Sequence, residues 1–240
     1  MTSGTESKQR EKLSRDRIID TALQIMDEEG LEAVSMRRVG RELGVEAMSL
    51  YHHVRDKDDL LLGIRERVLS TFSDPGTEGD WEERAREAAR SWRQILRTHP
   101  NMMVLISESK RFEMTPASMR PTETALRLLR EVGLPEDDAV KAFCALGGFI
   151  VGFVMFEIGV THASGPTDAP PTPEGLVAAL PSDEFPCFMS SLPYLMQGDL
   201  DERFEYGLDL LIAGIRSNGR SGKRHVQDNL FWQRLRAFLA

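Results

Sequence analysis

The side chains best able to carry specific chemistry gather in one stretch, SMRRVGRELGVEAMSLYHHVRDKDDLL, residues 35–62. Its apolar positions have the spacing needed to hold two short helices together: Val39, Leu43, Val45 and Leu50. Its polar positions supply donors for phosphate oxygens and base edges: Arg37, Ser49, Tyr51, His53 and Lys57. The stretch therefore predicts a nucleic-acid interface.

Helical spacing places these donors on short helices. Apolar residues recur every three or four positions over 17–29, and Gly30 ends that helix. Ser35 caps a second helix that Gly44 ends, and a third follows over 46–53. Two short helices joined by a turn form a helix-turn-helix, whose second helix enters the DNA major groove. A small bundle with a solvated face is the alternative; the turn glycine, the spacing and the donors favour DNA binding.

The motif resembles the tetracycline-repressor (TetR) family of one-component transcriptional regulators. Over 17–72, RIIDTALQIMDEEGLEAVSMRRVGRELGVEAMSLYHHVRDKDDLL carries the family pattern, and over 81–216 the resemblance continues more loosely through RTHPNMM, ALGGFIVGFVMFE and FEYGLDLLIAGI. It implies a three-helix DNA-binding domain, a linking fourth helix and a helical core that dimerises through a four-helix bundle. The function implied is a ligand-responsive repressor. Its homodimer binds a palindromic operator in double-stranded DNA and is released when a small organic effector binds the C-terminal domain.

The resemblance also assigns DNA-contacting roles. The start of the second helix contacts phosphate, the start of the third faces base edges, and the turn beyond it and the start of the fourth helix contact phosphate again. The predicted DNA-binding residues are Ser35, Met36, Arg37, Ala47, Met48, Ser49, Tyr51, His52, His53 and Lys57. Ala47 and Met48 stand where tetracycline repressors carry Gln and Pro, so this pair can meet thymine methyl groups but cannot make a bidentate adenine contact. The operator is therefore expected to differ from the tetracycline one.

The fold class expected is all-α, an N-terminal helix-turn-helix domain plus a helical ligand-binding and dimerisation domain, because no strand-like alternation of useful length appears. The sequence divides into a flexible basic arm, the DNA-binding domain with its linking helix, the effector-binding and dimerisation domain, and a basic amphipathic extension: 1–16, 17–72, 81–216 and 217–240. The proline-rich stretch 163–182 is expected to be a mobile loop. The extension has three open interpretations, namely an extra helix on the dimer, a DNA-contacting arm or a solvated tail.

Bulky and flexible apolar residues of the core domain predict a pocket for a large, partly aromatic effector. The same residue types are more often plain core, and that alternative stays open. His99, beside a proline, and Glu157, at the end of the apolar run 143–156, are the polar groups expected to point into such a pocket. The predicted effector-binding residues are His99, Met102, Met103, Ile106, Phe112, Met114, Phe149, Phe153, Phe156 and Glu157.

The family resemblance also bears on metal binding. Tetracycline repressors chelate a drug-bound magnesium through a histidine, and by register Ile106 occupies that position here, while Phe156 occupies an aligned glutamate position. Both replacements put an apolar group where a polar one is needed. The resemblance therefore implies a metal-free organic effector, with no cofactor and no metal site.

The long apolar helix expected over 136–161 predicts a dimer interface. A helix that is apolar nearly all round must be covered on several sides, and a monomer of this size has too few other elements to do that. Gly148 and Gly152 allow close approach of a neighbouring helix or room beside a ligand, and the first is favoured. The predicted two-fold interface comprises Gly148, Gly152, Leu208, Leu211, Ile212 and Ile215.

Composition excludes several other classes of protein. A hydrophobic fraction of 41% excludes a disordered chain, and two cysteines, with no apolar leader, indicate a cytoplasmic protein without a disulfide scaffold. The apolar run 143–156 is too short for a membrane span, so no membrane partner is expected. Enzyme motifs such as a phosphate loop or nucleophile elbow are missing, and a helical adaptor would not need clustered donors. The net charge of -8 comes mainly from 71–216, so it does not argue against DNA binding.

Overall fold

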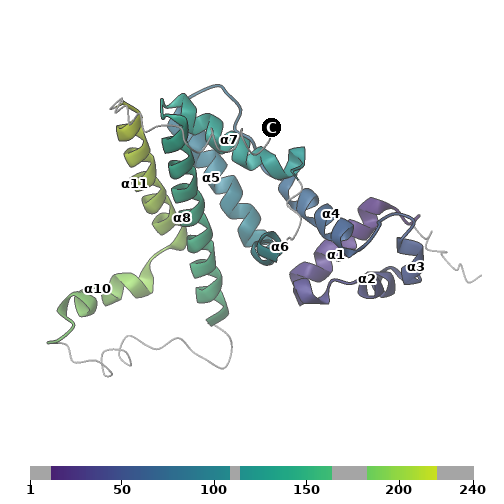
Figure 1. Ribbon diagram of the computed structural model, residues 1–240. Helices are drawn as coiled ribbons and strands as arrows, with labels where there is room; N and C mark the ends of the chain where they lie inside the picture. The colour runs from purple at the N-terminus through teal and green to yellow at the C-terminus, as the bar shows by residue number, and fades with distance from the viewer. Residues whose placement is uncertain (1–11, 109–113, 164–182, 221–240) are drawn as a thin grey trace, which may run out of the picture.

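The computed structural model describes residues 12–108, 114–163 and 183–220, and the regular structure in these ranges is helical with no strand (Figure 1). The N-terminal part contains α1 (Arg15–Glu29), a short 3-10 turn (Leu31–Ala33), α2 (Met36–Leu43), α3 (Ala47–Leu50) and α4 (Lys57–Leu69). The core contains α5 (Trp81–Thr98), α6 (Met102–Glu108), α7 (Pro116–Glu131), α8 (Glu136–Ala163), α10 (Pro186–Gln197) and α11 (Leu200–Arg220). The all-α prediction is confirmed.

Side-chain caps fix where the first helices begin. Three N-cap side chains accept a backbone N–H from the first turn of their own helix: Ser14 in α1, Ser35 in α2 and Asp56 in α4. Because Ser14 is the cap, Arg15 and Asp16 belong to α1 and not to the arm expected over 1–16. Residues 1–11 of that arm lie outside the described residues, as do 164–182 of the predicted loop and 221–240 of the extension.

Helix α3 is shorter than the 46–53 predicted. Beyond Leu50 the chain continues as a turn, in which the N–H groups of His53 and Val54 both donate to the Leu50 carbonyl oxygen, at 2.9 and 3.0 Å. Val54, at the end of this turn, lies in the core and is 1% exposed. The helix therefore ends early because the chain has to turn back toward α4.

Two glycines set the approach of α2 and α3. A Cβ on Gly40 would lie 3.0 Å from the carbonyl oxygen of Val45 and 3.3 Å from the backbone of Ala47, so a larger residue would push the helices apart. Gly44 ends α2 at φ 67°, in the left-handed region that glycine adopts without strain. The sequence identified the turn glycine Gly44 but not the close approach at Gly40.

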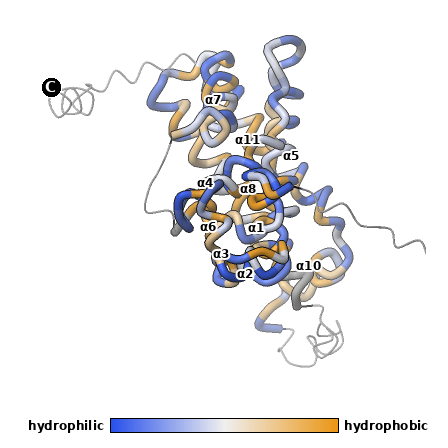
Figure 2. Tube along the Cα trace, turned by 90° about the vertical axis from the view of Figure 1, so that its right-hand side faces the viewer, coloured by the Kyte–Doolittle hydropathy of each residue, from blue (hydrophilic) through white to orange (hydrophobic). Residues whose placement is uncertain are grey.

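One hydrophobic core runs through both parts of the chain. In the core domain α5, α7 and α8 pack on one another and α11 lies along α8, while α4 contacts α6 and α7 (Figure 1). Apolar residues follow the helices through the middle of the molecule (Figure 2). Ile18 of α1, Ile64 of α4 and Leu96 of α5 are all fully buried in the same cluster. Movement of α4 is therefore coupled to both domains by direct packing.

Helix α8 is covered on one side only. Within the described residues, its segment Glu136–Gly159 is the one stretch long and apolar enough to cross a membrane by length and composition, longer than the run 143–156 considered above. Only 17% of its most apolar window is buried in the protomer. An apolar helix this exposed in a single copy needs a further surface to cover it.

Candidate nucleic-acid interface and effector cavity

The surface predicted to contact DNA, the recognition surface, is formed by α2, α3 and the turn that follows α3. Met48 is 71% exposed and Tyr51 46% exposed, and Arg37, His52 and Lys57 are exposed beside them. The remaining predicted residues of the surface are half-buried: Ser35, Ala47, Ser49 and His53. The helix-turn-helix therefore presents a methionine and several donors to solvent, and readout of base edges and phosphates requires such accessible groups.

Two neighbours of Arg37 are not available to DNA. Met36 was predicted to be a DNA contact, but its side chain is buried, because α2 packs this position against the domain core. Arg38 is held by Glu29 and by Glu42, whose Oε2 lies 2.6 Å from Nη1. Of the residues at the start of α2, Arg37 is the one whose charge faces outward.

A buried carboxylate anchors the turn between α3 and α4. Asp59 accepts two hydrogen bonds from the guanidinium of Arg15, at 2.8 and 3.0 Å, and one from the backbone N–H of Arg55 at 2.8 Å. Arg15 also donates to the carbonyl oxygen of His53 at 3.2 Å. The hydrogen bonds from Arg15 lower the pKa of Asp59 to about 2. This pair fixes the segment that bears Tyr51 and Lys57, and no sequence motif pointed to it.

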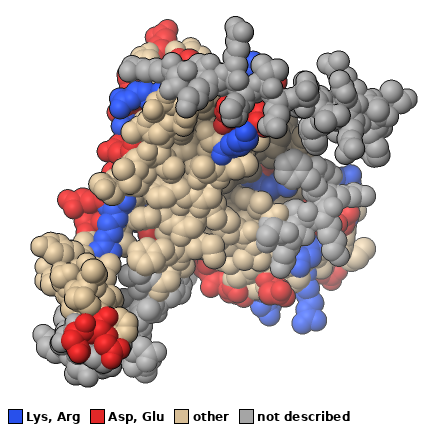
Figure 3. Space-filling view, turned by 60° about the vertical axis from the view of Figure 1, so that its left-hand side comes forward, with Lys and Arg blue, Asp and Glu red and all other residues tan. Residues whose placement is uncertain are grey.

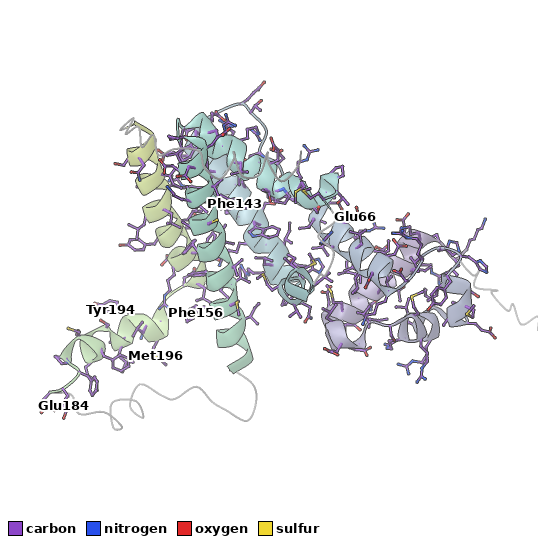
Figure 4. All side chains as sticks on the ribbon, in the orientation of Figure 1. Glu66, Phe143, Phe156, Glu184, Tyr194 and Met196 are labelled. Carbon is purple, nitrogen blue, oxygen red and sulfur yellow. The ribbon has the colours of Figure 1, made fainter. Side chains whose placement is uncertain are left out.

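The core domain encloses a cavity of about 330 Å³ bounded by α4, α5, α7, α8 and α11, with Ile106 contributed by α6. Four aromatic side chains stand on its wall: Phe72, Trp81, Trp92 and Phe143, the last of which is labelled on α8 in Figure 4. Arg65, Ser118 and Thr122 add polar groups to a wall that is otherwise mostly aliphatic. Its volume and lining are typical of sites for small, apolar organic molecules.

Of the ten predicted effector-binding residues, Ile106 lies on the wall of this cavity and the other described ones do not. Phe149 and Phe153 pack on the ring of Phe204, each with a centroid distance of 5.4 Å, and Met102 is fully buried. These residues belong to the hydrophobic core, with Met103 packed against them. These four residues are therefore part of the core, which is the alternative that the sequence left open.

The remaining predicted effector residues lie at three other places. Met114 is 74% exposed and Phe156, labelled in Figure 4, is 50% exposed, and neither lines the cavity. His99 Nδ1 lies 2.8 Å from the carboxylate of Asp27, which connects the end of α5 with α1. Phe112 lies outside the described residues.

Glu157 is not a polar group of the cavity. Its carboxylate is buried and accepts a hydrogen bond from Nε of Arg93 at 3.1 Å, and Nη2 of Arg93 binds its second oxygen. The expectation that Glu157 points toward an effector is corrected by this ion pair, since the same helix turn that ends the apolar run faces α5.

Both parts of the chain match models of one family. Residues 18–64 match the bacterial regulatory proteins of the tetR family, and residues 74–218 match the tetracyclin repressor-like C-terminal domain. The chain belongs to the TetR family. It is accordingly a ligand-responsive, DNA-binding transcriptional repressor rather than an enzyme, and it is dimeric.

Relatives within the TetR family include repressors and a ligand-bound structure. The chain is 32% identical over 214 residues to the HTH-type transcriptional repressor DrrR1 of Streptomyces coeruleorubidus, covering 85% of this chain and 77% of that protein. It is 29% identical over 209 residues to the tetracycline repressor protein class C of Escherichia coli, covering 85% and 91%. The crystal structure of the Streptomyces coelicolor TetR family protein ActR in complex with actinorhodin matches with a TM-score of 0.70 and 32% identity, covering 87% and 99%.

In this TetR-family chain the uncovered surface lies on α8 and α11. Figure 3 shows a broad uncharged face here, with acidic and basic side chains at its margins. A Cβ on Gly148 or Gly152 would meet nothing within 4 Å in the protomer. Large exposed side chains lie on the same two helices and on α10: Val140 and Met155 on α8, Tyr206 and Leu210 on α11, and Tyr194 on α10, the last of which is labelled in Figure 4.

The predicted interface residues of α11 point the other way. Leu208, Ile212 and Ile215 are buried inside the protomer, and Leu211 is half-buried. The apolar stripe seen in the sequence is the one that packs α11 onto α8 and the cavity, so it cannot also face a second protomer. Tyr206 and Leu210 are large exposed apolar side chains of the same helix, and the sequence did not point to them because they do not form its strongest helical stripe.

Proposed function

We propose that each protomer holds an operator half-site through the recognition surface and releases it when an organic effector enters the cavity. The observation that carries this proposal is the course of α4. This helix begins at Lys57, beside the recognition surface, and its last turns and the residues after it line the cavity through Arg65, Leu69 and Phe72. An effector that requires a different position of these residues must shift the helix that carries the DNA-contacting turn.

The free-energy argument is one of linkage. An effector weakens DNA binding only by as much as it prefers the conformation with altered α4, and such coupling typically amounts to about 1 to 3 kcal/mol. The hydrogen bond between His99 and Asp27, and that from Asn101 to the carbonyl oxygen of Met26 at 2.8 Å, connect the core domain to α1 as well. Motion of the core therefore acts on two sides of the DNA-binding domain.

On the DNA side, we assign phosphate contacts to Arg37, Tyr51 and Lys57, and readout of base edges to the start of α3. Arg55, whose side chain is 74% exposed, lies between Tyr51 and Lys57 in the sequence and adds a cation to the same surface. Met48 is the most exposed apolar group there and is suited to thymine methyl groups. In this proposal, residues 17–72 form the DNA-binding domain and residues 81–216 form the effector-binding and dimerisation domain. The protein acts in the cytoplasm.

On the effector side, the aromatic lining supports an aromatic organic ligand. The similarity to ActR, whose structures hold actinorhodin and (S)-DNPA, supports the same class of molecule. Ile106 places an aliphatic group on the wall at the position that the family resemblance gives to a magnesium-binding histidine. That residue favours an effector bound without a metal ion.

Filling the cavity tests the proposal. Gly147 lies on the cavity wall and a Cβ there meets nothing within 4 Å, so Gly147→Leu adds a bulky side chain at the wall without a clash at its Cβ. We expect Gly147→Leu to bind DNA from upstream of its own gene as the wild type does, but to need at least about tenfold more actinorhodin for release, measured by fluorescence anisotropy. Gly147→Ala, which adds one methyl group, is the matched control. Undiminished release from Gly147→Leu would place the effector outside this cavity.

A further inference from the structure

One charged side chain stands on the wall of the effector cavity. Among the described residues that line it, Arg65 is the only one with a formal charge, and its side chain is buried at 6% exposed. Apart from Ser118 and Thr122 on α7, the other side chains on the wall are aromatic or aliphatic. The cavity therefore combines flat apolar surfaces with one guanidinium.

A guanidinium in such surroundings discriminates strongly between ligands. Its planar fork matches the two oxygens of a carboxylate, and hydrogen bonds between ionised partners are about twice as strong as those between neutral ones. The surrounding wall is mostly apolar, which lowers the local dielectric and strengthens the attraction further. A neutral molecule of the same shape would gain the apolar contacts and lose this interaction.

We infer that the effector is an aromatic acid, a molecule with planar rings whose ionised carboxylate binds Arg65, and that Arg65 determines this specificity. The inference rests on the proposed function, because it assumes that the cavity is the effector site. It also explains how binding of the effector in the cavity is transmitted to the DNA-binding domain. Since Arg65 lies on α4, an anion that binds its guanidinium acts directly on the helix that begins at Lys57.

Two probes of equal shape test the charge. Anthracene-2-carboxylate and its primary amide have the same rings, and only the first is an anion. Quenching of tryptophan fluorescence reports their binding, since Trp81 and Trp92 line the cavity. We expect the wild-type dimer to bind the carboxylate about tenfold more tightly than the amide or better, the ratio that one charge-assisted hydrogen-bond pair provides.

Variants at Arg65 then assign the preference to its side chain. Arg65→Met keeps the length of the side chain and removes the charge, and it should lower carboxylate affinity about tenfold while leaving amide affinity within about twofold. Arg65→Lys should retain part of the preference. The control is Arg67→Met on the same helix, because Arg67 binds Asp16 and Asp20 and does not line the cavity.

The outcomes separate the two proposals. If the wild type binds acid and amide equally, the inference about the anion is overturned while the cavity remains the effector site; this comparison needs no variant to fold. Equal losses for both probes in Arg65→Met would make Arg65 a structural residue and overturn the inference as well. If Gly147→Leu fails to weaken either probe, the probes bind elsewhere and both proposals fall.

Discussion

Arg93 of α5 and Glu157 of α8 form an ion pair inside the helical body, with side chains only 7% and 6% exposed. Arg93 also donates to Asp201 at the start of α11 at 2.7 Å, and its guanidinium lies 4.3 Å from the ring centroid of Phe204. Burial lowers the pKa of Arg93, but the hydrogen bonds to the two carboxylates raise it more, so its net pKa lies above the usual value. One charged cluster therefore joins α5, α8 and α11.

Removing the Glu157 charge should destabilise the protein strongly. Glu157→Gln leaves Arg93 buried without its principal carboxylate, and breaking a buried pair in this way costs roughly 3 to 5 kcal/mol. Asp201→Asn is the comparison, because its carboxylate is 66% exposed and its loss should cost much less. Urea denaturation followed by circular dichroism measures both. Equal, small losses in the two variants would contradict a structural role for the pair.

The anchor between Arg15 and Asp59 predicts a dependence of stability on pH. The pKa of Asp59 is lowered from 3.8 to about 2, so the folded protein holds this carboxylate ionised more strongly than the unfolded chain does. Its contribution, up to about 2 kcal/mol, is complete above pH 4 and disappears as the pH falls from about 4 to about 2.

Comparing wild type with Asp59→Asn should reveal this contribution. We expect the difference in their unfolding free energies to be largest near pH 6 and to shrink between pH 4 and pH 2. Asp58→Asn, at the exposed neighbouring position, serves as the control and should show little such change. A difference between wild type and Asp59→Asn that persists unchanged at pH 2 would mean that packing, not charge, is lost.

The helix-turn-helix was predictable because its signals are local. A cap such as Ser35 and a stop such as Gly44 act within a few residues, and apolar spacing identifies the inward face of each short helix. Met36 was misassigned because a position carried over from a family motif does not say whether the side chain points in or out. The anchor from Arg15 to Asp59 joins residues 44 positions apart, and no local pattern records such a contact.

The effector cavity was harder to predict because its wall is assembled from six helices. Phe149, Phe153 and Glu157 have the composition of a pocket, but tertiary packing directs them against Phe204 and Arg93. No sequence pattern singled out Arg65. Its place on the cavity wall depends on how α4 packs on α7, which periodicity cannot reveal.

Two adjacent arginines should differ sharply in their effect on DNA binding. Arg37 is exposed on the recognition surface, whereas Arg38 is held by Glu29 and Glu42. Arg37→Ala should weaken binding to all DNA sequences similarly and reduce the slope of log affinity against log salt by about 1. Arg38→Ala should leave that slope unchanged. Fluorescence anisotropy titrations between low and moderate salt measure the two slopes. Equal slopes for the two variants would mean that Arg37 does not contact a DNA phosphate.

The two sides of α11 should also respond differently to substitution. Leu210 is 60% exposed on the uncharged face, whereas Leu208, two residues earlier, is fully buried and lines the cavity. Leu210→Glu places a charge in the face assigned to the partner protomer, and it should convert dimers to monomers while the helical circular dichroism is retained, because burying an unpaired charge is unfavourable. Size-exclusion chromatography with light scattering gives the mass.

Leu208→Ala is the counterpart of this variant on the inner side of the helix. It should lower the free energy of unfolding by about 2 to 5 kcal/mol, as large-to-small changes in a core do, and leave the mass of the folded protein dimeric. Operator affinity should fall for Leu210→Glu, because one dimer must hold both half-sites. For Leu208→Ala the operator affinity should stay at the wild-type level under conditions in which this variant is folded. If Leu208→Ala produced monomers and Leu210→Glu did not, the Leu208 side of α11, and not the Leu210 side, would face the partner protomer.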